Sequence, residues 1–390
     1  MTPSKLARLQ PLFLGLLLCC SGRAEAPDVA GEAENQQQSV KRYRKDAEQG
    51  NADAQCLLGD CYRTGRGVTE DKGEAVKWYR KAAEQGHAKA QCKVGNCYWF
   101  GVGVSQDRQE AVKWYRKAAE QGYAKAQCKL GACHILGQGV QTNHREAVKW
   151  YRRSAEQGDA AAQFYLGSCY QHGAGVQKDH KAAVKWFRQA AQQGYAAAQY
   201  NLGLAYHQGQ GVQTNHQEAV KWCRSAAEQG NAVAQNNLAL FYHQGQGLEK
   251  DHQEAVKWLR QAAEQGYAAA QYNLGRSYGH GEGVQKDQQE AVRWYRKAAK
   301  QGYAVAQCDL GLCYYQGKGV QMDRQEAVKW YRRAAGQGDA VAQSNLGACY
   351  YTGKGVRQDR QKAVKWFRQA AKQGNKAAIK ALRNLNQKNP

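Results

Sequence analysis

The sequence predicts an all-α protein, a right-handed α/α superhelical solenoid of nine 36-residue helix–loop–helix repeats. Nine tryptophans recur every 36 residues, from Trp78 to Trp366, without an insertion or deletion. Each interval holds two stretches with apolar residues at helical spacing, separated by a Gly-x-Gly element. A single hairpin of this kind cannot bury its own apolar face, so neighbouring repeats must stack.

The N-terminus predicts an export signal over residues 1–24. Lys5 and Arg8 precede an apolar run over residues 12–20, and small residues lead up to Ala24. Cleavage after Ala24 is favoured over cleavage after Ala26. The apolar run is too short to span a bilayer, and no later run is long enough to do so. We therefore expect a periplasmic or secreted protein.

Lipoprotein anchoring at Cys19 or Cys20 is less favoured, because Leu18 or Cys19 stands where a lipobox has a small residue. The remaining boundaries follow from composition and period. Residues 25–38 predict a flexible linker, 39–50 a half-repeat, 51–374 the nine repeats and 375–390 a C-terminal capping helix.

Residues 87–122 illustrate one repeat. Gly101 and Gly103 end the first helix in a short loop, and Asp107 with Glu110 has the spacing of a capping box that opens the second helix. Gly122 follows the second helix, where a left-handed C-cap is expected. Gly95 is expected to let neighbouring first helices approach closely.

The repeat pattern resembles that of the Sel-1-like repeat (SLR) family, which is related to tetratricopeptide repeats. One repeat carries the motif as Gln199, Leu202, Gly203, Tyr206, Gly209, Gly211, Val212, Ala219, Trp222, Ala226, Ala227 and Gly230. The departures are His134 at the Tyr position, Ala239 at a Gly position, and Asn143 and Asn215 at the Asp position. The resemblance covers about 340 of the 390 residues and implies a protein-interaction scaffold without catalytic chemistry.

The surface of the first helices is the leading candidate for a binding groove, because the repeats differ most there. Amide side chains at regular spacing can pair with the backbone of an extended peptide, and aromatic residues add contact area. The alternative is that these amides stabilise the helices or face water. The candidates are Phe164, Tyr165, Tyr200, Asn201, Asn236, Asn237, Tyr272, Asn273 and Asn345.

A basic ridge on the second helices is the alternative binding surface. The chain has 56 Lys and Arg against 33 Asp and Glu, a formal charge of +23. The ridge would suit anionic cell-wall or lipid groups, whereas export makes nucleic acid an unlikely partner; a purely solvated face is the simpler interpretation. Its residues are Lys77, Arg80, Lys113, Arg116, Lys149, Arg152, Lys185 and Arg188.

No pattern predicts an enzyme, a cofactor or a metal site. The sequence lacks the motifs of serine hydrolases, zinc peptidases and P-loop proteins, and no CxxC spacing is present. Small buried fillers are the favoured interpretation of the cysteines, with disulfides between repeats, such as Cys61–Cys92, as the alternative. The histidines, which gather between His134 and His280, are interpreted as solvated loop residues. We therefore expect a non-catalytic exported scaffold that binds a protein or peptide.

Overall fold

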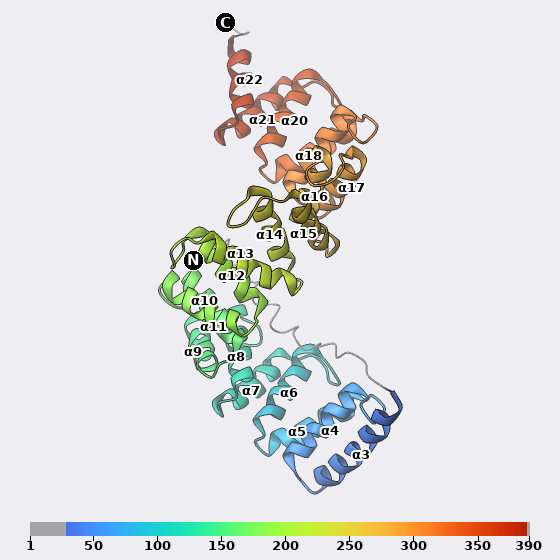
Figure 1. The fold of residues 1–390 in the computed structure, drawn as a ribbon, viewed down its shortest axis with the longest axis vertical. Coiled ribbons are helices and arrows are strands. Elements are labelled where there is room, and N and C mark those ends of the chain that lie inside the picture. The colour runs from blue at the N-terminus through green and yellow to red at the C-terminus, as the bar shows by residue number, and fades with distance from the viewer. Residues whose placement is uncertain (1–28, 388–390) are drawn as a thin grey trace. The chain divides into compact units, whose positions relative to one another are not determined.

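The computed structural model describes residues 29–387, where every regular element is an α-helix (Figure 1). The helices are α3 (Val29–Glu48), α4 (Ala52–Thr64), α5 (Lys72–Glu84), α6 (Ala88–Phe100), α7 (Arg108–Glu120), α8 (Ala124–Leu136), α9 (His144–Glu156), α10 (Ala160–His172), α11 (His180–Gln192), α12 (Ala196–Gln208), α13 (His216–Glu228), α14 (Ala232–Gln244), α15 (His252–Glu264), α16 (Ala268–His280), α17 (Gln288–Lys300), α18 (Ala304–Gln316), α19 (Arg324–Gly336), α20 (Ala340–Thr352), α21 (Arg360–Lys372) and α22 (Lys376–Gln387). The predicted all-α helical-repeat fold is confirmed. None of these helices combines the length and apolar character that a membrane span requires.

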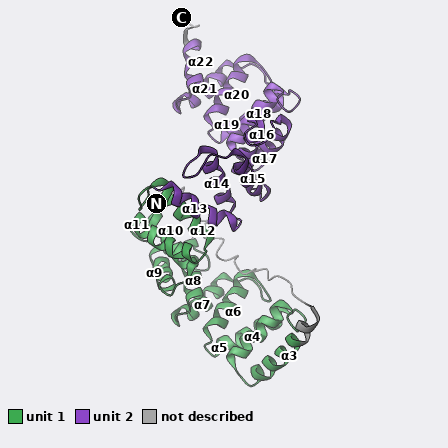
Figure 2. Ribbon diagram, in the orientation of Figure 1, with its two compact units in different colours: residues 1–214 green, residues 215–390 purple. Residues whose placement is uncertain are grey.

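The chain divides into two compact units, residues 1–214 and residues 215–390 (Figure 2). Within each unit, every helix packs against the helices that precede and follow it in the chain. The first unit begins with the unpaired α3 against α4, and the second ends with α22 against α21. Stability in each unit therefore comes from contacts between chain neighbours.

The N-terminal boundary differs from the prediction, because residues 29–38 of the expected linker are helical and belong to α3. This stretch is rich in Ala, Glu and Gln, which favour helix over coil, and its polarity hid that preference. Val40 and Ala47 further along α3 are buried against α4, so packing of the half-repeat supports the longer helix. The predicted signal peptide lies outside the described residues.

Capping residues fix where each helix begins and ends. Asp107 Oδ1 accepts the N–H groups of Gln109 and Glu110 at 2.9 and 3.0 Å, as the sequence predicts. The reciprocal half of the capping box is replaced, because the Asp107 N–H donates to the Tyr98 carbonyl at 2.9 Å. Gly122 follows the second helix with φ of +88°, which confirms the expected left-handed conformation.

Gly95 has a different role from the one predicted. A Cβ added there would lie 2.6 Å from the ring of Tyr115, so the missing side chain lets the second helix of the same repeat pack its ring against the first. The variant repeat agrees with this interpretation: where Ala239 replaces the glycine, Leu259 replaces the aromatic residue. The glycine and the aromatic ring therefore form a complementary pair within a repeat.

A buried glutamine at the fifth position of every repeat connects three helices. These nine side chains, from Gln55 to Gln343, are each 6% exposed or less. In α10, Gln163 Nε2 donates to the carbonyl of Ala155 in α9 at 3.1 Å. Its Oε1 accepts from Gln193, just beyond α11, at 2.8 Å. The Ala155 carbonyl also accepts the N–H of Gly158 at 3.0 Å, so the Gln163 amide adds a second bond at this helix end and ties the helix to the next repeat.

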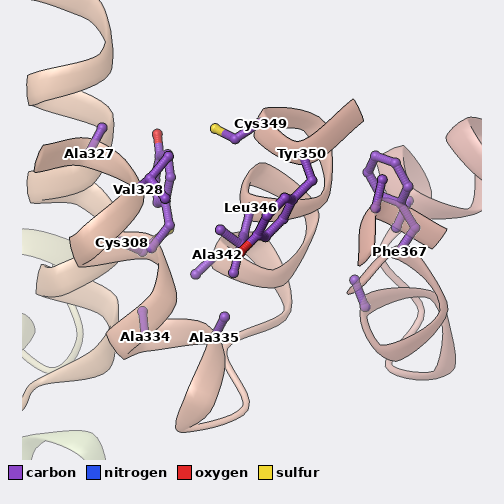
Figure 3. Packing of buried hydrophobic residues seen from close by; sticks show 14 of the residues in the cluster. Cys308, Ala327, Val328, Ala334, Ala335, Ala342, Leu346, Cys349, Tyr350 and Phe367 are labelled. Atoms are coloured by element: carbon purple, nitrogen blue, oxygen red, sulfur yellow. The ribbon is translucent and has the colours of Figure 1, made fainter. Parts of the chain in front are cut away.

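The core consists of many small clusters, one after another along the chain. Figure 3 shows the cluster at the C-terminal end, where Leu346 and Phe367 pack with alanines of α19 and α20. Ala378 and Leu385 of α22 belong to the same cluster and cover its outer side. The last helix thus closes an apolar surface that the next repeat would otherwise cover.

We expect Gln163→Ala to lower the free energy of unfolding by about 2 kcal/mol, because the buried Ala155 carbonyl and the Gln193 amide both lose a partner. Urea unfolding of the full chain, followed by circular dichroism, measures the change. Gln192→Ala, at an exposed site in α11, is the matched control and should change the midpoint little. Equal midpoints for the two variants would contradict a structural role for the buried amide.

Candidate protein-binding surface

Exposed apolar side chains concentrate on the first helices of the repeats, a surface we call the helix-one face. Of the seven large apolar residues that are exposed among residues 35–385, six lie on α4, α6, α18 and α20 and one lies in a loop. Val341 is 54% exposed, and Val305 and Leu312 are 39% and 37% exposed. Val305, Leu312, Val341 and Tyr351 lie on first helices of two successive repeats, which makes α18 and α20 the candidates for contact with a partner protein.

Two predicted groove residues are in the core, and for them the prediction is wrong. Phe164 and Tyr165 are only 2% and 1% exposed. The Phe164 ring lies 5.9 Å from that of Phe187, and the Tyr165 ring stacks on Tyr151 at 5.5 Å. The sixth position of a repeat faces inward in α10, because the neighbouring helices cover it.

The predicted asparagines mostly make contacts within the chain. Asn236 is buried and accepts from the Asn273 amide at 2.9 Å, which links α14 to α16. Asn201 donates to the Ala197 carbonyl one turn earlier at 2.8 Å, and Asn345 contacts the Cys308 sulfur at 3.9 Å. These bonds confine the amides to structural contacts, so they do not form the continuous peptide-binding row that spacing suggests.

The remaining candidates are half-buried. Tyr272 donates to Asp309 at 3.0 Å, again between neighbouring first helices, while Tyr200 and Asn237 are intermediate in exposure. Contacts between positions 6 and 7 of successive repeats therefore recur along the helix-one face. What varies from repeat to repeat is the chemistry of that contact.

The basic ridge is exposed, and most of its side chains have a bonding partner within the chain. Three of its lysines pair with a glutamate one turn earlier at 2.5–3.1 Å: Lys77, Lys113 and Lys149. Its arginines bond to a tyrosine hydroxyl of the following repeat, as Arg152 does with Tyr170 at 2.7 Å and Arg188 with Tyr206 at 3.0 Å; Arg80 bonds to Tyr98 in the same way.

Two ridge residues differ, since Lys185 has Ala182 at the glutamate position and Arg116 faces His134 where a tyrosine would stand. The bonds of the other arginines attach the second helix to the next repeat. Their role in the structure is thus local, and a binding role is not needed to explain their presence.

Histidine and cysteine positions offer little for chemistry. Across residues 29–387, no three His, Cys, Asp or Glu side chains converge as metal ligands would. Nδ1 of His243 lies 2.9 Å from Nδ1 of His252, and burial lowers the pKa of His243. None of the eleven cysteines among the described residues forms a disulfide, and burial raises the pKa of Cys97 to about 11 and that of Cys169 to about 12. Such thiols are poor nucleophiles at neutral pH.

The helix-one face also carries charge that the sequence analysis passed over. On the first unit, Asp60 accepts the Tyr79 hydroxyl at 2.6 Å and forms an ion pair with Lys93 of the next repeat. Beside this pair lies a hollow of about 310 Å³ between α6, α8 and the start of α10. The signal in the sequence was the lysines at positions 3 and 7 of only the second and third repeats.

The stacked helix pairs define an all-α helical-repeat protein. The family description Sel1 repeat matches nine consecutive segments, residues 52–87, 88–123, 124–159, 160–195, 196–231, 232–267, 268–303, 304–339 and 340–375. The chain belongs to the Sel1-repeat family. No curated protein matches it.

Two solved structures resemble the whole repeat region. One is a protective antigen of uropathogenic Escherichia coli strains that displays an SLR fold, with 36% identity over 87% of this chain and 80% of that one and a TM-score of 0.66. The other is a Sel1 repeat protein from Oxalobacter formigenes, with 31% identity over 95% of this chain and 99% of that one and a TM-score of 0.61. Both comparisons support the same repeat architecture.

His134 should make stability depend on pH. Burial lowers the pKa of His134 in the folded protein below its ordinary value of 6.5. The free energy of unfolding is therefore highest above pH 6.5, and it decreases as the pH falls towards the pKa of the folded protein, because the unfolded chain binds the proton more readily. We expect His134→Tyr to reduce this loss and to gain about 1 kcal/mol from a bond with Arg116 like those of its counterparts. Urea midpoints at pH 7.5 and 5.0 measure both effects.

The exposed His280→Gln is the matched control and should keep the wild-type profile. A His134→Tyr variant whose midpoint falls between the two pH values as far as that of the wild type would overturn this assignment.

Proposed function

We propose that this protein is a non-catalytic scaffold that binds a segment of a partner protein on its helix-one face. Sel1-repeat proteins generally mediate protein–protein interactions, which supports the class of function. The observation that carries the choice of face is the set of exposed apolar side chains on α18 and α20, which belong to successive repeats of the second unit. None of the exposed large apolar residues that the structure describes lies on a second helix, and most side chains of the helix-two ridge bond within the chain, which favours the helix-one face over the ridge.

The apolar residues of α18 and α20 suit hydrophobic side chains of a partner. Val305 and Leu312 lie two turns apart on α18, and Val341 takes the place of Val305 on α20, one repeat later. Burying residues of this type contributes about 25 cal/mol for each Å² removed from water. A partner segment crossing successive first helices would therefore gain affinity at each one.

Site-specific photo-crosslinking in the native host tests the face. A benzophenone amino acid at Val305 or Val341 should yield an adduct of the same mass, because both positions contact one partner. The same group at Lys257 or Lys329, exposed on second helices, should yield none. Adducts formed only from α15 and α19 would contradict the proposal.

Export is the second part of the proposal and is supported by the charged, apolar and small-residue sections of residues 1–24. We expect the mature protein to begin at Glu25 and to be found outside the cytoplasm. Mass spectrometry of the N-terminal peptide, after cell fractionation, measures this. A cytoplasmic protein that retains residues 1–24 would overturn it.

A further inference from the structure

The hollow between α6, α8 and the start of α10 is strongly basic. Four lysines line it, and the single carboxylate among its lining residues is that of Asp159. Asp159 caps α10 by accepting the Ala162 N–H at 2.8 Å, so one of the hydrogen bonds that its carboxylate can accept is already made within the chain. Tyr123, Cys92 and Cys128 supply a less polar wall. The site therefore combines positive charge with room for a side chain.

Lys129 is the unusual member of this group. It is 8% exposed, yet its ammonium forms no ion pair or hydrogen bond with any residue between 29 and 387. Its one recorded neighbour is the ring of Tyr115, whose centroid lies 6.0 Å away. Since no group of the described chain pairs with it, this ammonium is open to a carboxylate from outside the chain.

The preceding repeat shows what that interaction looks like. Lys93 stands 36 residues before Lys129, lies over Tyr79 in the same way at 5.3 Å, and is paired with Asp60. The residue that corresponds to Asp60 in the next repeat is Asn96, which accepts only the Tyr115 hydroxyl at 2.9 Å. The second set of residues thus has the lysine and the tyrosine but an asparagine in place of the aspartate. Asn96 and Lys129 both line the hollow.

We propose that an acidic segment of the partner protein places an Asp or Glu carboxylate in this hollow against Lys129. The inference rests on the proposed function and gives the chemistry of the partner at one point of the helix-one face. Lys89 and Lys125, both exposed at the hollow, provide the charge that attracts further acidic residues. The formal charge of +23 favours an acidic partner over a basic one.

A random dodecapeptide library displayed on phage and selected on the full chain is the first test. Peptides that bind are synthesised with a fluorophore, and fluorescence anisotropy gives their dissociation constants. We expect them to be enriched in Asp and Glu and to bind Lys129→Met at least about tenfold more weakly. Lys113→Gln removes the same charge from the helix-two ridge and should change the constant less than about twofold.

Asn96→Asp is the decisive variant, because it keeps every lysine. The new carboxylate should pair with Lys129 as Asp60 pairs with Lys93. It would then compete with the acidic peptide and raise the dissociation constant of the peptide at least about tenfold. Neither Asn96→Asp nor Lys129→Met should lower the urea midpoint, because the first adds an ion pair and the second keeps an unbranched side chain of similar length. This separates lost recognition from lost folding.

The outcomes distinguish this inference from the proposed function. Peptides without acidic residues that still need Val305 and Val341 would overturn the acidic site and keep the helix-one face. Peptides that bind all helix-one variants equally would overturn both. Equal weakening by Lys113→Gln and Lys129→Met, or stronger binding of heparin than of any peptide, would show general attraction to polyanions and would also overturn the acidic site.

Discussion

The buried glutamine of each repeat is the interaction on which the rest of the fold depends. An α-helix ends with carbonyl groups that have no partner in the helix, and here each second helix ends next to the following repeat. One amide donates to such a carbonyl in the preceding helix, beside the N–H of the glycine that follows that helix, and accepts from a second glutamine in its own repeat. Because the first of these bonds joins consecutive repeats, it fixes how the second helix of one repeat lies against the first helix of the next.

The same regularity leaves a few positions free to vary. The interior positions hold alanine, leucine, glycine and an aromatic ring in nearly every repeat, because each ring needs a glycine opposite it. The residue at position 6 of one repeat contacts the residue at position 7 of the next. This contact is Asn236–Asn273 in one pair of repeats and Tyr272–Asp309 in the following pair. Differences between repeats are therefore expressed as different inter-repeat contacts on one face.

The sequence contained enough to predict the period, the helix pairs and most of the helix ends, since Asp107 and Gly122 act through contacts a few residues away. It was less informative where contacts join repeats. Whether position 6 faces water depends on how adjacent helices are rotated, so Phe164 was assigned to the surface although it is buried. Lys93 and Lys129 look alike in sequence, and only the residue across the repeat boundary, Asp60 or Asn96, separates them. The polarity of residues 29–38 masked their preference for helix, so α3 was not predicted to extend through them.

The order of the repeats carries information that no single repeat contains. Since all repeats have the same length, recombination between homologous repeats can delete one of them in register, and the glutamine contacts can re-form across the junction. Loss of residues 87–122 would bring Lys129 into the place of Lys93, next to Asp60, and give its ammonium a counter-charge. The shortened protein would keep its architecture and lose a chemical feature that depended on which two repeats were neighbours. Copy-number change in such a gene is therefore a route to altered specificity without any point mutation.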